Sequence, residues 1–317
     1  MFSVEFENFS SESIVDRIKA EGYFALAGAL TAEFVEKMNQ DVGPLDVSVN
    51  KNHVPAVVYK NQRYLTHCLA HSRSIFDLMT SEPLLGVMRG YFGDQFRLTD
   101  QRVYVTEAGE KMQWHVDNKL DSGLKTNYSG LIFIFYLSDV TQGQLQIVKS
   151  SHLWSRTHAE PDFLDSFIAG SRQGEVVDFK MPKGSVIVYT TDLIHRAAPI
   201  KDKQWERTSL FFQVERKQQG GEPILLNTSF LRDLTEEKKT FLGFGADPEY
   251  GIFPPTDINT MRIKHLLRIA SICLVHSFRA AIMNRLWKMS PDSRVRLKHI
   301  LRKNRPISTG SELQPKQ

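Results

Sequence analysis

The sequence has 317 residues, of which 41% are apolar and 24% charged, so it can bury one large core or two smaller ones. The first thirteen residues carry acidic side chains and no apolar run, so they do not resemble a signal or transit peptide, and the cytoplasm is the expected location. Cys68 and Cys273 form no Cys-x-x-Cys motif, which excludes a disulfide framework and a thiolate zinc site.

The first third of the chain is expected to be mainly helical. Apolar residues at helical spacing predict three helices, at residues 10–19, 31–43 and 81–91. Serines precede the first helix and Gly22 ends it, while Thr31 is suited to cap the second. Tyr23 to Leu26 is expected to form a short strand between them.

From Phe96 onward the apolar residues recur at the period of strands. Eight strands are expected, near residues 97–106, 112–117, 130–138, 144–149, 175–181, 185–190, 194–199 and 207–215. Eight strands without intervening helices predict a mainly β fold, a double-sheet barrel or sandwich. Residues 131–137 are apolar on both faces, which indicates a central strand covered on both sides. Residues 151–173 interrupt the pattern and are expected to form a loop or helical insertion.

The charge of the chain changes after the body ends at Pro254 and Pro255. Between Arg262 and Arg305 there are 12 Lys and Arg against one acid, although the whole chain carries only +4. The expected organisation is a domain with a β core, then a basic helical extension, then a disordered tail: residues 1–256 with the core at about 96–215, residues 257–306, and residues 307–317.

Two interpretations of the basic extension stay open. Its apolar face can pack on the body or on a second subunit, or it can lie in an anionic membrane interface with Trp287 at headgroup level. Nucleic acid is not an expected partner, because sustained apolar faces have no use on a phosphate backbone. A membrane span is not expected either, because Arg268, His276 and Arg279 bracket the most apolar window.

Three residues have the types and order of a metal site. His115 and Asp117 stand two apart in an expected strand, so both side chains leave the same face and can bind one cation. Such a pair also arises by chance, but His195 closes a β-rich run 78 residues later and supplies a second imidazole. Two histidines and one carboxylate are the facial ligand set of oxygen-activating non-haem iron. The alternative is a set of hydrogen-bonded core residues, which we favour less for all three together.

A rival metal pair occurs at His158 and Glu160, which have the same spacing. This pair lies in the irregular stretch beside Pro161, where no strand fixes the directions of the side chains. We therefore favour the first pair.

Arg207 begins an otherwise apolar strand, where a buried guanidinium needs an anionic partner. The distal carboxylate of a dicarboxylate co-substrate can accept two parallel hydrogen bonds from Arg207 and a third from Ser209 on the same strand face. The 2-oxo acid end would then take two of the open metal positions and leave one for oxygen. The alternative is a structural arginine that pairs with an acid of the body.

Further motifs surround these residues in a fixed order. They are Ile18-Lys-Ala-Glu-Gly-Tyr-Phe-Ala-Leu26, Trp114-His-Val-Asp117, Ile132-Phe-Ile-Phe-Tyr-Leu-Ser-Asp139, Gly143-Gln-Leu-Gln-Ile-Val148, Ser150-Ser-His152 and Gly184 to Pro199. In these motifs the chain resembles the phytanoyl-CoA dioxygenase family of Fe(II)/2-oxoglutarate oxygenases over about residues 14–230. Ser150 departs from the family, which usually has glycine there, and this departure concerns only the geometry of a turn.

The resemblance implies a double-stranded β-helix of the jelly-roll, cupin-like type. It also implies that Fe(II), 2-oxoglutarate and O2 are used, with His115, Asp117 and His195 as iron ligands and Arg207 as the carboxylate anchor. Tyr104 and Thr190 are candidates for further contact with 2-oxoglutarate. Iron halogenases of the superfamily have a small residue at the position of the carboxylate ligand, so Asp117 favours hydroxylation or a related oxidation of a small molecule.

The residues beside the metal pair are candidates for substrate contact: Gln113, Asn118 and Lys119. Trp114 alternates to the other side of the strand, and core packing is favoured for it. Residues 121–126 are placed to form a lid.

Two other functions stay open, a catalytically silent binding module on the same scaffold and a cupin-type Zn or Mn enzyme that does not use 2-oxoglutarate. The sequence does not separate acyl-CoA, amino-acid, osmolyte and natural-product substrates.

Overall fold

The computed structural model describes most of the chain: residues 1–43, 62–66, 68–94, 96–109, 112–117, 129–154, 165–216, 224–245, 263–287 and 293. The chain forms two compact units, of which the first holds Met1–Thr157 with Arg172–Gly251 and the second His158–Ser171 with Ile252–Gln317. Four predictions lie outside the described residues: the pair at 158 and 160, Asn118 with Lys119, the loop at 121–126 and the tail at 307–317.

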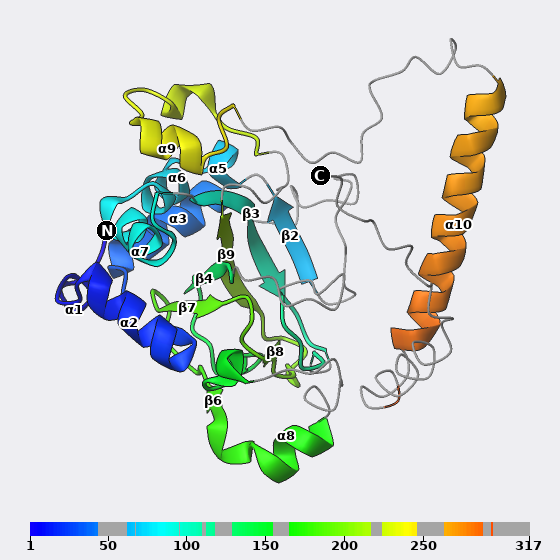
Figure 1. Ribbon diagram of the computed structural model, residues 1–317, viewed down its shortest axis with the longest axis horizontal. Coiled ribbons are helices and arrows are strands. Elements are labelled where there is room, and N and C mark those ends of the chain that lie inside the picture. The colour runs from blue at the N-terminus through cyan, green and yellow to red at the C-terminus, as the bar shows by residue number, and fades with distance from the viewer. Residues whose placement is uncertain are drawn as a thin grey trace, which may run out of the picture. The chain divides into compact units, whose positions relative to one another are not determined.

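The described strands form two antiparallel sheets in the first unit (Figure 1). Their bounds are β1 Tyr23–Leu26, β2 Gln62–Thr66, β3 Phe96–Thr106, β4 Leu131–Tyr136, β5 Leu145–Val148, β6 Val176–Asp178, β7 Val186–Thr190, β8 His195–Ala197 and β9 Arg207–Arg216. One sheet has six strands in the order β1-β7-β4-β9-β3-β2, and the other has three in the order β6-β5-β8. Two facing antiparallel sheets of this kind are the architecture of a jelly roll.

Most of the strand predictions are confirmed, and one is wrong. Strands lie at seven of the eight ranges expected after Phe96, and β1 lies at 23–26 as expected. Residues 112–117 do not form a strand: they make one isolated β-bridge, between His115 and His195, and further backbone hydrogen bonds from Met112 and Asp117 that do not extend it into a ladder. β2 was not expected from the sequence.

The helices of the described chain include every one that was predicted. Their bounds are α1 Val4–Glu7, α2 Ser11–Glu21, α3 Ala32–Val42, α5 Cys68–His71, α6 Arg73–Met79, α7 Glu82–Phe92, α8 Asp165–Ser171, α9 Glu236–Phe241 and α10 Ile263–Trp287, with short 3-10 helices at Ser151–Leu153, Gln173–Glu175 and Thr228–Phe230. Hydroxyl caps set the predicted starts: Ser10 Oγ accepts from Ser13 N–H and Thr31 Oγ1 from Phe34 N–H. Gly22 ends α2 in the left-handed conformation with φ +89°.

The six-stranded sheet is covered on both faces, and β4 shows this most clearly. Leu131, Phe133 and Phe135 pack in a core with the helices of the first unit, which lie on one side of the sheet (Figure 1). Ile132 and Ile134 belong to a second core, which lies between the two sheets. The prediction of a central strand covered on both sides is therefore confirmed.

Phe135→Ala should destabilise the fold by about 3–5 kcal/mol, because it removes a fully buried ring and leaves a cavity. The ring packs edge-on against Phe212, with 6.0 Å between centroids. Urea unfolding would measure the loss. Phe244→Ala, at a ring that is 47% exposed, is the matched control and should change stability far less. Equal effects of the two substitutions would contradict this account of the core.

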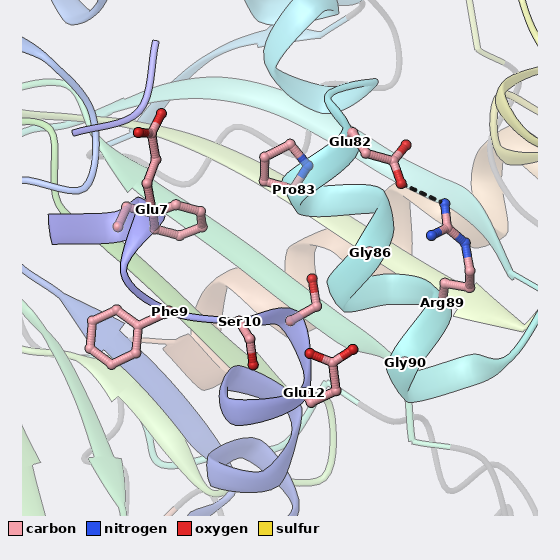
Figure 2. A pocket seen from close by; sticks show the side chains of 11 residues that line it. Glu7, Phe9, Ser10, Glu12, Glu82, Pro83, Gly86, Arg89 and Gly90 are labelled. Atoms are coloured by element: carbon pink, nitrogen blue, oxygen red, sulfur yellow. Dashed lines mark hydrogen bonds and ion pairs between the residues drawn. The ribbon is translucent and has the colours of Figure 1, made fainter. Parts of the chain in front are cut away.

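Glycines let α2 and α7 approach closely. A Cβ added at Gly86 would lie 2.5 Å from Ser11 Oγ, and one at Gly90 would lie 3.2 Å from Val15 Cγ2. A hollow of about 570 Å³ lies beside this contact. Figure 2 shows the side chains that line it, among them Glu82 and Arg89, which form an ion pair at 3.0 Å. The residues that line this hollow come from the N-terminal segment and α7, and none of them is a predicted site residue.

The extension after the body contains α10, a helix of 25 residues in the second unit. This confirms helical structure within the expected range of 257–305. Among the described helices, none combines the length and the apolar character that crossing a bilayer requires.

Candidate metal centre

His115, Asp117 and His195 come together in the first unit. Each offers one ligand atom, and these atoms all lie within 4.8 Å of one another. His195 Nε2 lies 3.2 Å from Asp117 Oδ2, and His115 Nε2 lies 3.7 Å from Asp117 Oδ1. Two nitrogens and one carboxylate at these separations can bind one divalent cation.

The backbone fixes the three residues relative to one another. His115 and His195 exchange both of their N–H to carbonyl hydrogen bonds, at 3.0 and 2.9 Å, and Asp117 N–H donates to Thr191 O at 3.0 Å. The segment before His195 is fixed in turn, because Ile194 N–H donates to Ser151 Oγ at 2.8 Å. His115 and His195, which are 80 positions apart in the sequence, are thus held side by side by backbone hydrogen bonds.

Both imidazoles are oriented by a backbone carbonyl two residues earlier. His115 Nδ1 lies 2.8 Å from Gln113 O, and His195 Nδ1 lies 2.9 Å from Leu193 O. An Nδ1–H that donates to a carbonyl leaves the lone pair on Nε2, and in both rings this is the atom that lies near Asp117. Such second contacts are usual for metal-binding histidines.

The charges of the cluster suit a cation. Burial, and then His195, lower the pKa of His115 to about 4, so this ring is neutral near pH 7. Burial alone would raise the pKa of Asp117, but the two histidines hold it well below its usual range. Burial opposes a charged His195, but Asp117 raises the pKa of that ring above its ordinary value. A cation that binds here would compete with a proton for His195 Nε2.

Ser150, the departure from the family pattern, adopts the left-handed backbone conformation with φ +59°. This conformation favours glycine, which explains why a glycine is usual at this position. Ser150 N–H donates to Glu21 O at 2.8 Å, and His152 Nε2 lies 3.0 Å from Lys19 O. The Ser-Ser-His segment therefore joins the end of α2 to the strand that carries His195.

Arg207 is buried on β9, on the face that looks into the space between the sheets. It is 3% exposed, and its Nη atoms donate to Gly143 O and, at 3.3 Å, to Thr106 Oγ1. Its guanidinium also lies 5.5 Å from the centroid of the Tyr104 ring. Within the described part of the chain no carboxylate pairs with Arg207, so the alternative of a structural ion pair finds no support there.

Two buried polar atoms at this position lack a hydrogen-bond partner in the structure. They are Arg207 Nε and Ser209 Oγ, and Ser209 is 0% exposed. Buried donors without partners are costly, and a carboxylate ligand would satisfy both. The residues present therefore fit the carboxylate of 2-oxoglutarate.

The other predicted residues differ in position. Tyr104 lies opposite Ser209 in the sheet and shares its face. Thr190 follows Tyr189, which lies between the sheets, so strand alternation turns Thr190 to the helix side, away from Arg207. Gln113 is half-buried, and its carbonyl orients His115.

Trp114 is 2% exposed and packs under the Arg196 guanidinium, 4.0 Å from the ring centroid, in accord with the packing role that the sequence favoured.

The three candidate metal ligands, His115, Asp117 and His195, are called the donor set below. Sequence reasoning missed several charged and aromatic residues near it. Tyr189 has its hydroxyl 3.5 Å from His195 Nε2. Arg102 forms an ion pair with Asp100, lies 4.2 Å over the Phe211 ring and lowers the pKa of Asp117 after the histidines. The alternation of β3 around Tyr104 is a signal in the sequence that could have found Arg102 and Asp100.

Comparisons with known proteins agree with this geometry. A family profile described as phytanoyl-CoA dioxygenase (PhyH) matches residues 18–208. A search of curated proteins finds no match. The non-heme alpha-ketoglutarate-dependent epimerase SnoN from nogalamycin biosynthesis is similar in structure, with a TM-score of 0.52 at 20% identity over 78% of this chain and 93% of that one.

Two further solved structures are similar. HygX from Streptomyces hygroscopicus, with nickel and 2-oxoglutarate bound, has a TM-score of 0.52 at 16% identity over 66% of this chain and 87% of that one. EctD from S. alaskensis, with 2-oxoglutarate and 5-hydroxyectoine, has a TM-score of 0.53 at 18% identity over 67% and 78%. These likenesses establish the jelly-roll fold.

The class is that of non-haem iron oxygenases that use 2-oxoglutarate. Within it, the chain belongs to the phytanoyl-CoA dioxygenase (PhyH) family.

Proposed function

We propose that this protein hydroxylates a small-molecule substrate. One oxygen atom of O2 would enter the substrate as a hydroxyl group, and the other would enter succinate as 2-oxoglutarate loses CO2. His115, Asp117 and His195 would hold Fe(II), which supplies the oxygen activation, while Arg207 and Ser209 would hold the distal carboxylate of 2-oxoglutarate.

The observation that carries the proposal is the buried Arg207. A guanidinium that is 3% exposed and has no described carboxylate partner needs an anionic ligand, and 2-oxoglutarate provides one. A metal centre that works without 2-oxoglutarate, or a silent binding module, leaves this arginine without a purpose. Tyr104 supports the same role, because its ring lies beside the guanidinium.

Anaerobic addition of Fe(II) and 2-oxoglutarate tests the proposal directly. The complex should give the weak visible charge-transfer band of a 2-oxo acid on ferrous iron, and admission of O2 with a substrate should release succinate. A Zn or Mn enzyme would show activity with those metals and no succinate. A protein that binds the metal without giving the band would refute the use of 2-oxoglutarate.

For the C-terminal extension we propose contact with an anionic membrane surface. Large apolar side chains of α10 recur at spacings of seven, four and four residues, at Leu267, Leu274, Phe278 and Ile282, and are 43–71% exposed. α10 contains no Asp or Glu, and Arg279 is exposed beside this face. Exposed apolar and basic side chains on one helix, without acids, are complementary to anionic headgroups over acyl chains.

Phe278→Glu in the full chain should reduce binding to vesicles of anionic lipid by roughly tenfold, because it removes apolar burial and adds repulsion. Co-sedimentation would measure it. Leu225→Glu, at an apolar residue of the first unit that is 59% exposed, is the matched control. If the helix instead packs on the body or on a second copy, Phe278→Glu would leave vesicle binding unchanged and alter thermal stability or molecular mass in solution.

A further inference from the structure

The face of β3 and β9 that contains Arg207 carries a second group of charges at its other end. Residues directly opposite each other in two strands share a face, as do alternate residues in each strand. The opposed pairs on this face are Thr106 with Arg207, Tyr104 with Ser209, Arg102 with Phe211, Asp100 with Gln213, and Arg97 with Glu215. A register shift between Leu98 and Asp100 keeps Arg97 on this face.

Three of these residues, Asp100, Arg102 and Glu215, lie within electrostatic reach of Asp117. Burial raises the pKa of Asp100, and Asp117 adds to the rise against the opposing effect of Arg102. Burial also raises the pKa of Glu215 to about 7, with smaller contributions from Asp192 and Asp117. The donor set thus has Arg207 toward one end of the strand pair and this second group toward the other.

The charges of Arg102 and Asp100 balance each other, because the two residues form an ion pair. Glu215 is different. It is 7% exposed, and its carboxylate accepts a hydrogen bond from Gln213 Nε2 at 2.8 Å, but no cation of the described chain pairs with it. Gly130 makes room for the carboxylate, because a Cβ there would lie 2.2 Å from Glu215 Oε1.

Arg97, opposite Glu215, is also buried. It is 6% exposed, its Nε has no hydrogen-bond partner, and no carboxylate of the described chain pairs with it. A buried cation and a buried carboxyl group that face the same space without pairing are both unfavourable in the free protein. A ligand that brings one charge of each sign would pair with Arg97, and its positive group would favour the carboxylate form of Glu215.

We propose that Arg97 and Glu215 form the substrate-binding end of the site and that the substrate is a small zwitterion of the amino-acid type. Its carboxylate would bind Arg97 and its protonated nitrogen Glu215. Directly opposed residues have Cβ atoms roughly 4.5–5.5 Å apart, which suits two charges on one small head group. The rest of the molecule would extend toward the donor set. This inference rests on the proposed function and selects one substrate class from those that the sequence left open.

The test is succinate release by the full-length, Fe(II)-loaded enzyme with each of the twenty common L-amino acids, their N-acetyl and carboxamide derivatives, and acyl-CoA thioesters. At least one free amino acid should raise the rate above the substrate-free rate. Its N-acetyl and carboxamide forms should each lower kcat/KM by roughly tenfold or more, because each removes one charge. Turnover of acyl-CoA alone, or no stimulation by any free amino acid, would overturn the inference.

Variants locate the binding site. Glu215→Gln and Arg97→Gln should each raise KM for the active amino acid by roughly tenfold or more and leave the Fe(II)/2-oxoglutarate band unchanged. Glu5→Gln, at an exposed residue, is the matched control. If a glutamine variant is unstable, Arg97→Lys keeps the charge and should recover part of the affinity. A pair that serves only the fold would change thermal stability and leave KM unchanged, which would refute the assignment. Loss of the band in the parent enzyme would instead refute the proposed function.

Discussion

Arg207→Ala should weaken the binding of 2-oxoglutarate to the Fe(II) enzyme by roughly 100-fold or more. It removes the buried cation that faces the co-substrate, and loss of one partner of a buried charge pair costs about 2–5 kcal/mol. Anaerobic titration of the charge-transfer band with 2-oxoglutarate would measure the change in Kd. Ser209→Ala should have a smaller effect in the same direction, because it removes one neutral donor.

Two controls separate ligand binding from folding. Arg207→Lys keeps the charge but loses the planar fork that donates to Gly143 O, so its affinity should lie between those of the parent and the alanine variant. Arg73→Ala, at an arginine that is 53% exposed and pairs with Asp77, should leave the affinity unchanged. An alanine variant of Arg207 that is folded and binds 2-oxoglutarate within twofold of the parent would exclude the proposed role.

Asp117→Asn should reduce Fe(II) affinity by roughly 100-fold or more and lower succinate release accordingly. The substitution keeps the shape of the side chain but removes the one anion of the donor set, a larger change than the loss of an outer contact, which by itself costs about 10–100-fold. Metal content after dialysis, together with succinate release, would measure both effects.

The same substitution should also change the protonation of His195. Since the Asp117 carboxylate raises the pKa of that ring, the pKa should fall in the apo variant. Imidazole chemical shifts against pH would follow it. An asparagine variant that retains both its iron and the original pKa of His195 would show that Asp117 is not part of the cluster.

The three ligands of the donor set could be predicted from the sequence, because each occupies a position that the local pattern of residues identifies. His115 and Asp117 are two residues apart, and His195 closes an apolar run. What sequence rules do not supply is the pairing of His115 with His195, since a single bridge between distant segments leaves no periodicity. For the same reason, the strand expected at 112–117 is wrong although the direction of its two ligands is right.

The substrate end of the site was harder to predict than the co-substrate end. Arg207 stands out as a charge in an apolar strand, whereas Arg97 and Glu215 come at the ends of strands where charges are common. Their common face depends on the register shift after Leu98, which is set by pairing with β9. Thr190 is the opposite case, a predicted residue that does not face the site. Counting along β7 from Tyr189 would have shown that its side chain turns away from Arg207.

The reciprocal backbone bonds of His115 and His195 bear on how the enzyme is loaded. Because these bonds join backbone atoms and leave the imidazole nitrogens out, the conformational entropy of bringing the two ligand segments together should be lost during folding of the chain and not during capture of the metal. Iron uptake should then be a single bimolecular step whose rate is proportional to ferrous ion concentration. The metal-free protein should remain folded, so that iron can dissociate and rebind repeatedly without the chain having to refold.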